Sequence, residues 1–289
     1  MSIIVTGGKL ADGTITKTTE VIGLDEPCGT RIGPSMIVAR YFHAQVRMKS
    51  GDVFVCGGQN SQEQYIDSCE AWSGMTKDFQ KLNDKMHHGR RHHAVVCLPN
   101  GKILVIGGST KEGFFNDTCE LFDPVTESFT LLTVKLTVPM SYVSACMLPN
   151  GEVFIFGLGE GASCFEYYSP TQNIFGGHGR IPDPLYPTAC IYKGAGKVLL
   201  LGGPEKATKM TMLFDLDNRT LSEGPATNIE RKFPFVCNYG NGNLFVGGWS
   251  EATGKLSIGE FYDPASNSFN TGCMFIKSRY GPAASKYQY

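Results

Sequence analysis

The chain has 289 residues, of which 42% are hydrophobic and 18% charged, and its formal net charge is −1. This composition is typical of a folded protein, and the near-neutral charge gives no reason to expect binding to nucleic acid or to an anionic membrane surface. No segment is apolar for long enough to form a transmembrane helix. The 35 glycines favour a fold with many tight turns.

The first residues, Met1 to Gly8, are apolar but lack the length and the basic flank of a secretory signal. Ten cysteines are scattered singly along the chain, and the absence of any CxxC pair argues against zinc-ribbon and thioredoxin-like sites. Most of them lie in apolar strand patterns, where cysteine packs as a small hydrophobic residue. We therefore predict free thiols at all ten positions and a cytoplasmic location.

Glycine pairs end short apolar runs at a regular interval. The pairs are Gly7-Gly8, Gly57-Gly58, Gly107-Gly108, Gly202-Gly203 and Gly247-Gly248, with a degenerate copy at Gly157-Leu158. Their spacing of about 45 to 50 residues divides the chain into six units, and such a period is typical of propellers and other repeat folds.

The third unit shows the pattern in full. Residues 91–98 form a predicted first strand, the Asn100-Gly101 hairpin signal follows, and residues 102–106 form a second strand that ends at the glycine pair. Residues 118–122 form a third strand, Asp123-Pro124 turns the chain, and residues 128–131 form an outer fourth strand. Four antiparallel strands joined in this order make one propeller blade.

Two further positions recur across the units, a glutamate in the third strand and a phenylalanine in the fourth. The glutamates are Glu20, Glu70, Glu120, Glu166 and Glu260, and the phenylalanines are Phe79, Phe129, Phe175 and Phe269. Together with the glycine pairs, this pattern resembles the kelch repeats of the galactose oxidase superfamily over essentially the whole chain. The resemblance implies an all-β fold, a six-bladed kelch-type β-propeller with four antiparallel strands in each blade. Phenylalanine stands where many kelch repeats have tryptophan, and the fourth glycine pair is broken.

The two ends of the chain are complementary. The sequence begins at a second strand, and residues 279–289 match a first strand. We predict one domain over residues 1–289, with blade 1 built from residues 279–289 plus about 1–35 and blades 2–6 over about 36–278. The C-terminal strand would pair into the N-terminal blade and so remove an open sheet edge.

Equivalent positions of the six units form columns, and two columns lead into the first strands, where one mouth of the propeller is expected. The first column is Arg40, Arg90, Met140, Leu185, Glu230 and Arg279, and the second is Tyr41, Arg91, Ser141, Tyr186, Arg231 and Tyr280. Arginine and tyrosine are enriched in binding hot spots, and guanidinium groups bind carboxylates. We predict that these arginines, tyrosines and Ser141 line a binding mouth, chiefly Arg91 and Arg231, which break their column. Arg40, Arg90 and Arg279 share a column, so a role in bracing the blades stays open for them.

Two aromatic residues, Phe114 and Trp249, also depart from their columns and lie in loops between second and third strands. Each of them could contact a partner or could cover a neighbouring loop, and the sequence leaves both roles open. Four histidines cluster at 87–93, but His92 and His93 are adjacent in a strand and point to opposite faces. We predict no metal site and no cofactor.

The predicted function is a non-enzymatic, monomeric interaction module that binds a partner protein, through an acidic segment, at the Arg/Tyr-rich mouth. The resemblance to kelch substrate adaptors, which hold acidic peptides with Arg, Ser and Tyr, points the same way. The alternative is a carbohydrate-active enzyme of the sialic acid mutarotase-like kelch type, in which Glu230 would act as an acid or base.

Overall fold

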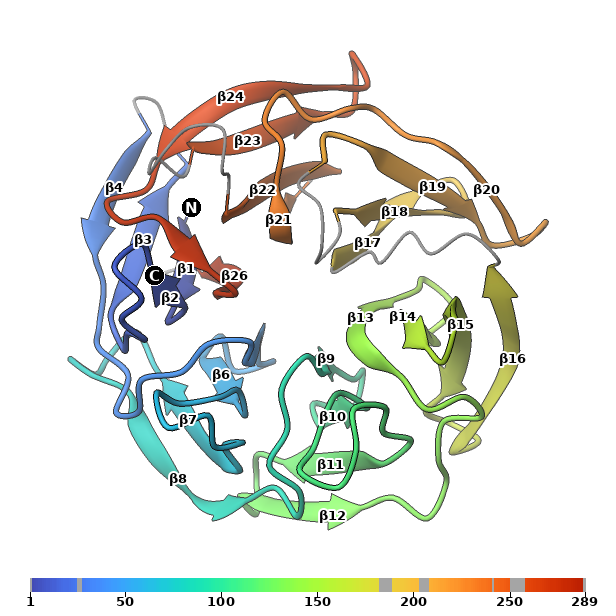
Figure 1. Ribbon diagram of the computed structural model, residues 1–289, viewed down its shortest axis with the longest axis horizontal. Coiled ribbons are helices and arrows are strands. Elements are labelled where there is room, and N and C mark those ends of the chain that lie inside the picture. Colours follow the sequence, from blue (N-terminus) through green and yellow to red (C-terminus); the bar gives the residue numbers. More distant parts are fainter. Residues whose placement is uncertain are drawn as a thin grey trace.

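The computed structural model describes residues 2–24, 28–181, 189–202, 208–240, 242–249 and 258–287. These residues form six four-stranded antiparallel sheets arranged as blades around a central axis (Figure 1). The predicted six-bladed all-β propeller is therefore confirmed. In the described part of the chain no helix is long and apolar enough to span a membrane.

Each blade runs from an innermost first strand to an outermost fourth strand. The strands of blade 1 are β26 (Ala283–Tyr287), β1 (Ser2–Thr6), β3 (Thr19–Gly23) and β4 (Gly29–Ile32). Those of blade 2 are β5 (Ala44–Arg47), β6 (Val53–Cys56), β7 (Ser68–Trp72) and β8 (Gln80–Lys85). Those of blade 3 are β9 (Ala94–Cys97), β10 (Ile103–Ile106), β11 (Cys119–Asp123) and β12 (Ser128–Leu131).

Blades 4 to 6 repeat the same order. Blade 4 has β13 (Ser141–Met147), β14 (Val153–Gly159), β15 (Ala162–Ser169) and β16 (Ile174–Ile181). Blade 5 has β17 (Ala189–Gly194), β18 (Lys197–Leu201), β19 (Thr211–Asp215) and β20 (Thr220–Glu223). Blade 6 has β21 (Lys232–Gly240), β22 (Asn243–Trp249), β23 (Ile258–Asp263) and β24 (Ser268–Met274). A short pair, β2 (Lys9–Leu10) with β25 (Arg279–Tyr280), lies beside blade 1.

The core lies between neighbouring blades, and the second strands show why their sequences are continuously apolar. In β10, Leu104 packs with Ile155 of blade 4, whereas Val105 packs with Phe54 of blade 2. Successive side chains of a strand point to opposite faces, and both faces of β10 are covered by another blade. The apolar run before each glycine pair therefore predicts an inner, fully buried strand.

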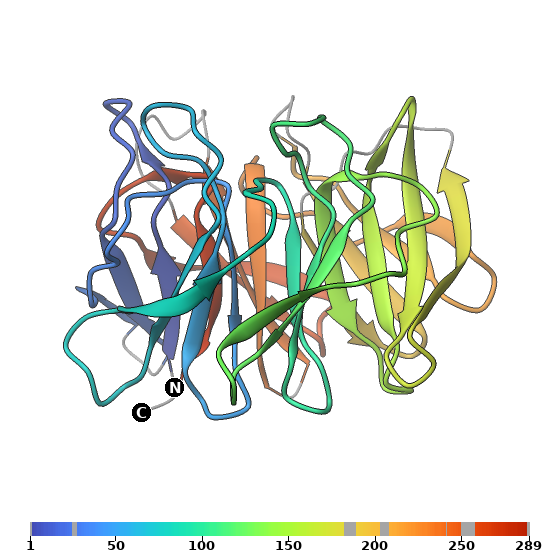
Figure 2. The same ribbon diagram turned by 90° about the horizontal axis from the view of Figure 1, so that it is seen from below.

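The C-terminal strand closes the ring as predicted. β26 pairs antiparallel with β1 from Ser2 opposite Tyr287 to Thr6 opposite Ala283, and β3 covers the other edge of β1 (Figure 1). Both termini consequently lie at one face of the ring (Figure 2). We call it the terminal face; it also carries the hairpins between first and second strands. The opposite face, which carries the loops between second and third strands, is the mouth face.

A disulfide joins blades 1 and 6 at the same junction. Cys28 and Cys273 are bonded, with their Cα atoms 5.7 Å apart and a sequence separation of 245. The prediction of ten free thiols is therefore wrong for this pair, and the other eight cysteines are free. The sequence predicts that blades 1 and 6 meet, but it does not show which cysteines face each other across that junction.

Candidate binding mouth

Four arginines at the mouth face are buried in ion pairs with the recurrent glutamates of the third strands. Arg90 Nη2 lies 2.6 Å from Glu120 Oε1, and both side chains are 0% exposed. Arg90 Nη1 also donates to the carbonyl oxygens of Gly107, at 2.9 Å, and Thr118, at 3.0 Å. The equivalent pairs are Arg40–Glu70 at 2.7 Å, Arg231–Glu260 at 2.8 Å and Arg279–Glu20 at 2.9 Å.

Each paired glutamate also holds the connection that arrives from the preceding blade. Glu120 of blade 3 accepts hydrogen bonds from the backbone N–H groups of His87, at 2.7 Å, and His88, at 3.2 Å. We call this arrangement of arginine, glutamate and connecting backbone the Arg–Glu clamp. A guanidinium that is buried and paired in this way cannot reach a partner. The predicted place of Arg40, Arg90, Arg231 and Arg279 in the lining of the mouth is therefore wrong, and the contacts of Arg40, Arg90 and Arg279 fit the bracing role that the sequence leaves open for them.

The assignment of Arg231 to the Arg91 column was one residue out of register. The residue that pairs with Trp249, directly after a glycine pair, is Lys232, just as Arg91 pairs with Ser109 after its own glycine pair. The pairing of β21 with β22 shifts register twice, so counting back from the glycine pair gives the wrong position in blade 6. Lys232 therefore takes the place predicted for Arg231, and Glu230 lies exposed just before the clamp.

Arg91 stays at the rim of the mouth. Its guanidinium donates to Gln59 Oε1 and lies 5.4 Å from the centre of the Tyr65 ring. Tyr41 donates from its hydroxyl to the same Gln59 oxygen at 2.7 Å. Among the residues that the structure describes, Arg91 forms no ion pair. Its charge is thus held in place by neutral groups and is not cancelled by a carboxylate.

The other predicted mouth residues divide into two groups. Ser141 is fully buried, and its hydroxyl lies 2.8 Å from that of Ser109, so its prediction as a ligand is wrong. Trp249 and Tyr280 are half-buried and meet edge to face with ring centres 6.2 Å apart. Phe114 is 43% exposed and rests edge to face on Tyr142. Tyr186 and Leu185 lie outside the described residues.

A third column, directly after the rim residues, was missed by sequence reasoning. Its members Phe42, His92, Tyr142 and Phe233 have φ values of 54°, 54°, 50° and 46°, and Gly281 has 60°. The rings converge: Phe42 lies 4.1 Å from His92 and 4.9 Å from Phe233, and His92 lies 4.2 Å from Tyr142. We call these four side chains the aromatic plug.

The plug narrows the central channel below the mouth. Gly281, at the same column position of blade 1, takes a left-handed φ without strain, whereas such a backbone costs about 1–3 kcal/mol at a bulky residue. Burial lowers the pKa of His92 well below its usual value, so the ring is neutral, and neither nitrogen has a hydrogen-bond partner within the described structure. The cavity beside the rings measures about 90 Å³, which is room for only about three water molecules.

The histidines form no metal site in the part of the chain that the structure describes. His43 Nε2 lies 2.7 Å from Thr6 Oγ1, and His93 Nε2 lies 3.4 Å from Cys56 Sγ. His87 is paired with Glu120 at 3.0 Å. These contacts are all within the scaffold.

Residues 90–133 match the kelch motif. This segment contains the clamp of blade 3, from Arg90 through Glu120, and its outer strand. The chain is a six-bladed β-propeller with a kelch motif in its third blade. The structure entitled "Structure of YjhT" superimposes on this propeller with a TM-score of 0.72 over 93% of this chain and 97% of that chain, at 14% sequence identity. No curated protein matches the propeller at a significant level.

Proposed function

We propose that this kelch propeller is a non-enzymatic protein-interaction module whose mouth binds an acidic segment of a partner protein. The observation that carries the proposal is the aromatic plug, because rings from four blades converge and the cavity beside them measures only about 90 Å³. A ligand would rest on these rings and not descend between the blades, which suits a protein segment better than a small substrate. The enzyme alternative requires a deeper pocket at the axis.

The rim supplies the residue types of a protein-binding site. Trp249 and Tyr280 come together from blades 6 and 1, and aromatic rings of this kind are frequent hot spots. The clamp arginines add no net charge, since each is paired with a glutamate. Arg91, which forms no ion pair among the described residues, supplies positive charge at the mouth, and Lys232 occupies the equivalent position of blade 6. A guanidinium held as Arg91 is can bind a carboxylate through two hydrogen bonds.

The test is affinity capture from the source organism, followed by titration of the recovered partner against wild-type and variant propellers. Arg91→Ala with Lys232→Ala should weaken binding by about 1–3 kcal/mol, because charge-assisted contacts are lost. Binding should also weaken as salt rises. The matched control is Lys102→Ala with Lys197→Ala, two lysines paired with aspartates on the terminal face.

Two results would contradict the proposal. In the first, the partner binds with an affinity that ignores both the salt concentration and the Arg91/Lys232 change. In the second, no protein binds, but an acidic sugar such as sialic acid raises the melting temperature and is turned over only when Glu230 is intact. The second result would establish the carbohydrate-active alternative.

A further inference from the structure

Grooves open on the terminal face between neighbouring blades, and two of them are of nearly equal size. The groove between blades 4 and 5 encloses about 530 Å³, and the groove between blades 2 and 3 encloses about 540 Å³. Both are bounded by the inner hairpins of their two blades and by the outer turn of the second blade. The propeller architecture therefore gives both grooves a similar size, and the residues that line them distinguish one groove from the other.

In the groove between blades 2 and 3 the charged groups are already bound within the protein. Lys102 Nζ lies 3.0 Å from Asp123 Oδ2, and Glu127 accepts a hydrogen bond from Asn83 at 2.9 Å. Lys49 Nζ donates to the carbonyl oxygen of Pro99 at 2.5 Å. The contacts of Lys49 and Glu127 join the two blades, and the Lys102–Asp123 pair lies within blade 3. Asp52, which also lines this groove, accepts from the Ser50 hydroxyl at 2.8 Å, so little is left for a ligand to bind.

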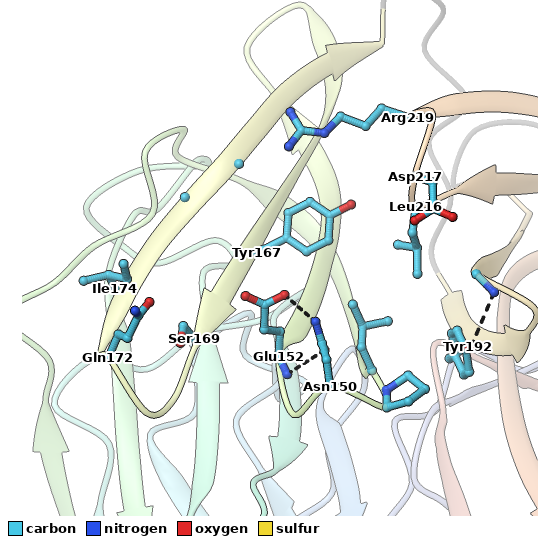
Figure 3. A pocket seen from close by; sticks show the side chains of 15 residues that line it. Asn150, Glu152, Tyr167, Ser169, Gln172, Ile174, Tyr192, Leu216, Asp217 and Arg219 are labelled. Atoms are coloured by element: carbon cyan, nitrogen blue, oxygen red, sulfur yellow. Dashed lines mark hydrogen bonds between the residues drawn. The ribbon is translucent and has the colours of Figure 1, made fainter.

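The groove between blades 4 and 5 differs, as Figure 3 shows. Tyr167 projects into it from β15, and Arg219 reaches over it from the turn between β19 and β20. Within the described residues neither Arg219 nor Asp217 forms an ion pair, and Glu152 is bonded through its side chain to Asn150 alone, at 2.8 Å. The carboxylates and the guanidinium thus face the same hollow without neutralising one another.

Two glycines of β16 keep this groove open. A Cβ atom added to Gly176 would meet nothing within 4 Å, and one added to Gly177 would lie 3.0 Å from the ring of Tyr167 and 3.6 Å from Arg219 Nη2. The wall beside Tyr167 is therefore bare backbone. Burial raises the pKa of Tyr167, as do Glu152 and Asp217, while Arg219 opposes them, so its hydroxyl is protonated at neutral pH and can both donate and accept.

The arrangement of charge restricts the class of ligand. A simple anion would bind Arg219 but would be repelled by Glu152 and Asp217, and a simple cation would meet the opposite conflict. A polyhydroxylated neutral molecule satisfies both kinds of group, because each hydroxyl donates to a carboxylate or accepts from a guanidinium. Its C–H faces can pack on Tyr167 and on the apolar side chains of Leu148 and Leu216.

We propose that the groove between blades 4 and 5 is a binding site for a neutral saccharide, separate from the mouth. Glu152 and Asp217 would accept from its hydroxyls, Arg219 would donate to them, and Tyr167 would stack on a sugar face. The volume lies within the range of about 300–1,000 Å³ that small-molecule sites occupy.

The test is saturation-transfer NMR with glucose, galactose, mannose, maltose and lactose, followed by calorimetry on any sugar that binds. Arg219→Asn should reduce affinity at least about tenfold. This variant keeps the fold, because Asn173 and Asn267 occupy the same turn position with φ values of 52° and 51°, against 55° for Arg219. The matched control is Glu127→Asn, at the same turn position of blade 3 with φ 50°.

We expect saturation transfer to at least one sugar, loss of it in Arg219→Asn and in Asp217→Asn, and retention in Glu127→Asn and in Arg91→Ala. The last variant separates this site from the mouth, so either proposal can fail alone. Absence of transfer to every sugar at millimolar concentration would overturn the proposal. Binding that survives both groove substitutions, or binding of glycine or acetate in place of sugars, would overturn it as well.

Discussion

Blades 3 and 4 solve the same structural problem in different ways. In blade 3 Arg90 and Glu120 form the complete clamp, whereas in blade 4 the arginine position is Met140 and the glutamate, Glu166, remains. The backbone position is the same, since Met140 accepts from Gly108 N at 2.9 Å and Arg90 accepts from Gly58 N at 2.8 Å. Only the cation differs.

What Glu166 does without an arginine shows what the clamp is for. It accepts hydrogen bonds from Thr137 N, at 3.0 Å, and from the Thr137 hydroxyl, so it still holds the connection from the preceding blade. Blade 5 lacks the glutamate as well as the arginine. Met212 takes the glutamate position of its third strand and lies opposite Leu200 of the second strand. The carboxylate therefore fastens blade to blade, and the arginine serves to keep that carboxylate charged within the interior.

The largest expected effect comes from making blade 3 resemble blade 4. Arg90→Met should lower the free energy of unfolding by about 3–5 kcal/mol, because it leaves the Glu120 carboxylate buried without its cation. Adding Glu120→Gln should recover much of the loss, since the amide keeps an oxygen for the His87 N–H and carries no charge. Urea denaturation of both variants measures this difference.

A loss below about 1 kcal/mol for Arg90→Met would break the comparison, because such a value is typical of exposed pairs. Met140→Leu in blade 4 provides the control at the equivalent position. It exchanges one buried apolar side chain for another of similar volume and should change stability by less than about 1.5 kcal/mol.

The second effect concerns the junction of blades 6 and 1, where the Arg279–Glu20 clamp is joined by the Cys28–Cys273 disulfide. Cys28→Ser should lower the free energy of unfolding by about 2–5 kcal/mol, because the bond closes a long loop in the unfolded chain. No equivalent loss of stability is expected at blade junctions that lack a disulfide.

Thiol counting in denaturant without reductant measures the bond directly, with eight reactive thiols expected, equal to the eight free cysteines. A count of ten thiols would show that Cys28 and Cys273 are not bonded, and no stability loss would then be expected for Cys28→Ser. Disulfides persist mainly in oxidising compartments, so eight thiols in protein isolated from its native source would count against the proposed cytoplasmic location.

The repeat was readable from sequence wherever its signals are local. Glycine pairs, the Asn100-Gly101 turn and the recurring glutamates predict strands and blades, and the leftover first strand at residues 279–289 predicts the closure. These signals arise because each blade meets the same packing demands as the next. The fold could therefore be derived almost entirely from one chain.

The site was less predictable, for three physical reasons. Arg231 was misplaced because blade 6 has one residue fewer between the clamp arginine and its glycine pair, a difference that shows only in the strand register. The aromatic plug depends on side chains from four blades meeting at the axis. The disulfide joins residues 245 apart in sequence. The one available signal was Gly281, which marks a column suited to a left-handed backbone and occupied by aromatic residues in blades 2, 3, 4 and 6.

The smallest effect concerns pH and separates Glu166 from the clamped glutamates. Burial raises the pKa of Glu166 above the ordinary value of 4.5, against the opposing hydrogen bonds from Thr137. The folded protein therefore keeps this proton to a higher pH than the unfolded chain does. Unfolding releases the proton between the two pKa values, so the contribution of Glu166 to stability falls as the pH rises through that interval.

Glu166→Gln removes this titration, so its stability relative to the wild type should rise as the pH is raised from the ordinary pKa of glutamate toward neutrality. In the wild type, the hydrogen bond from the Thr137 hydroxyl lowers the pKa of Glu166. Thr137→Val removes this bond and raises that pKa further, so the fall in stability with rising pH should be larger than in the wild type. Urea denaturation across this range measures both. A difference between wild type and Glu166→Gln that is independent of pH, or that changes in the opposite sense, would show that Glu166 is as well stabilised in its charged form as a clamped glutamate. The arginine would then be dispensable for charge, and the contrast between blades 3 and 4 would have to rest on packing of Met140 alone.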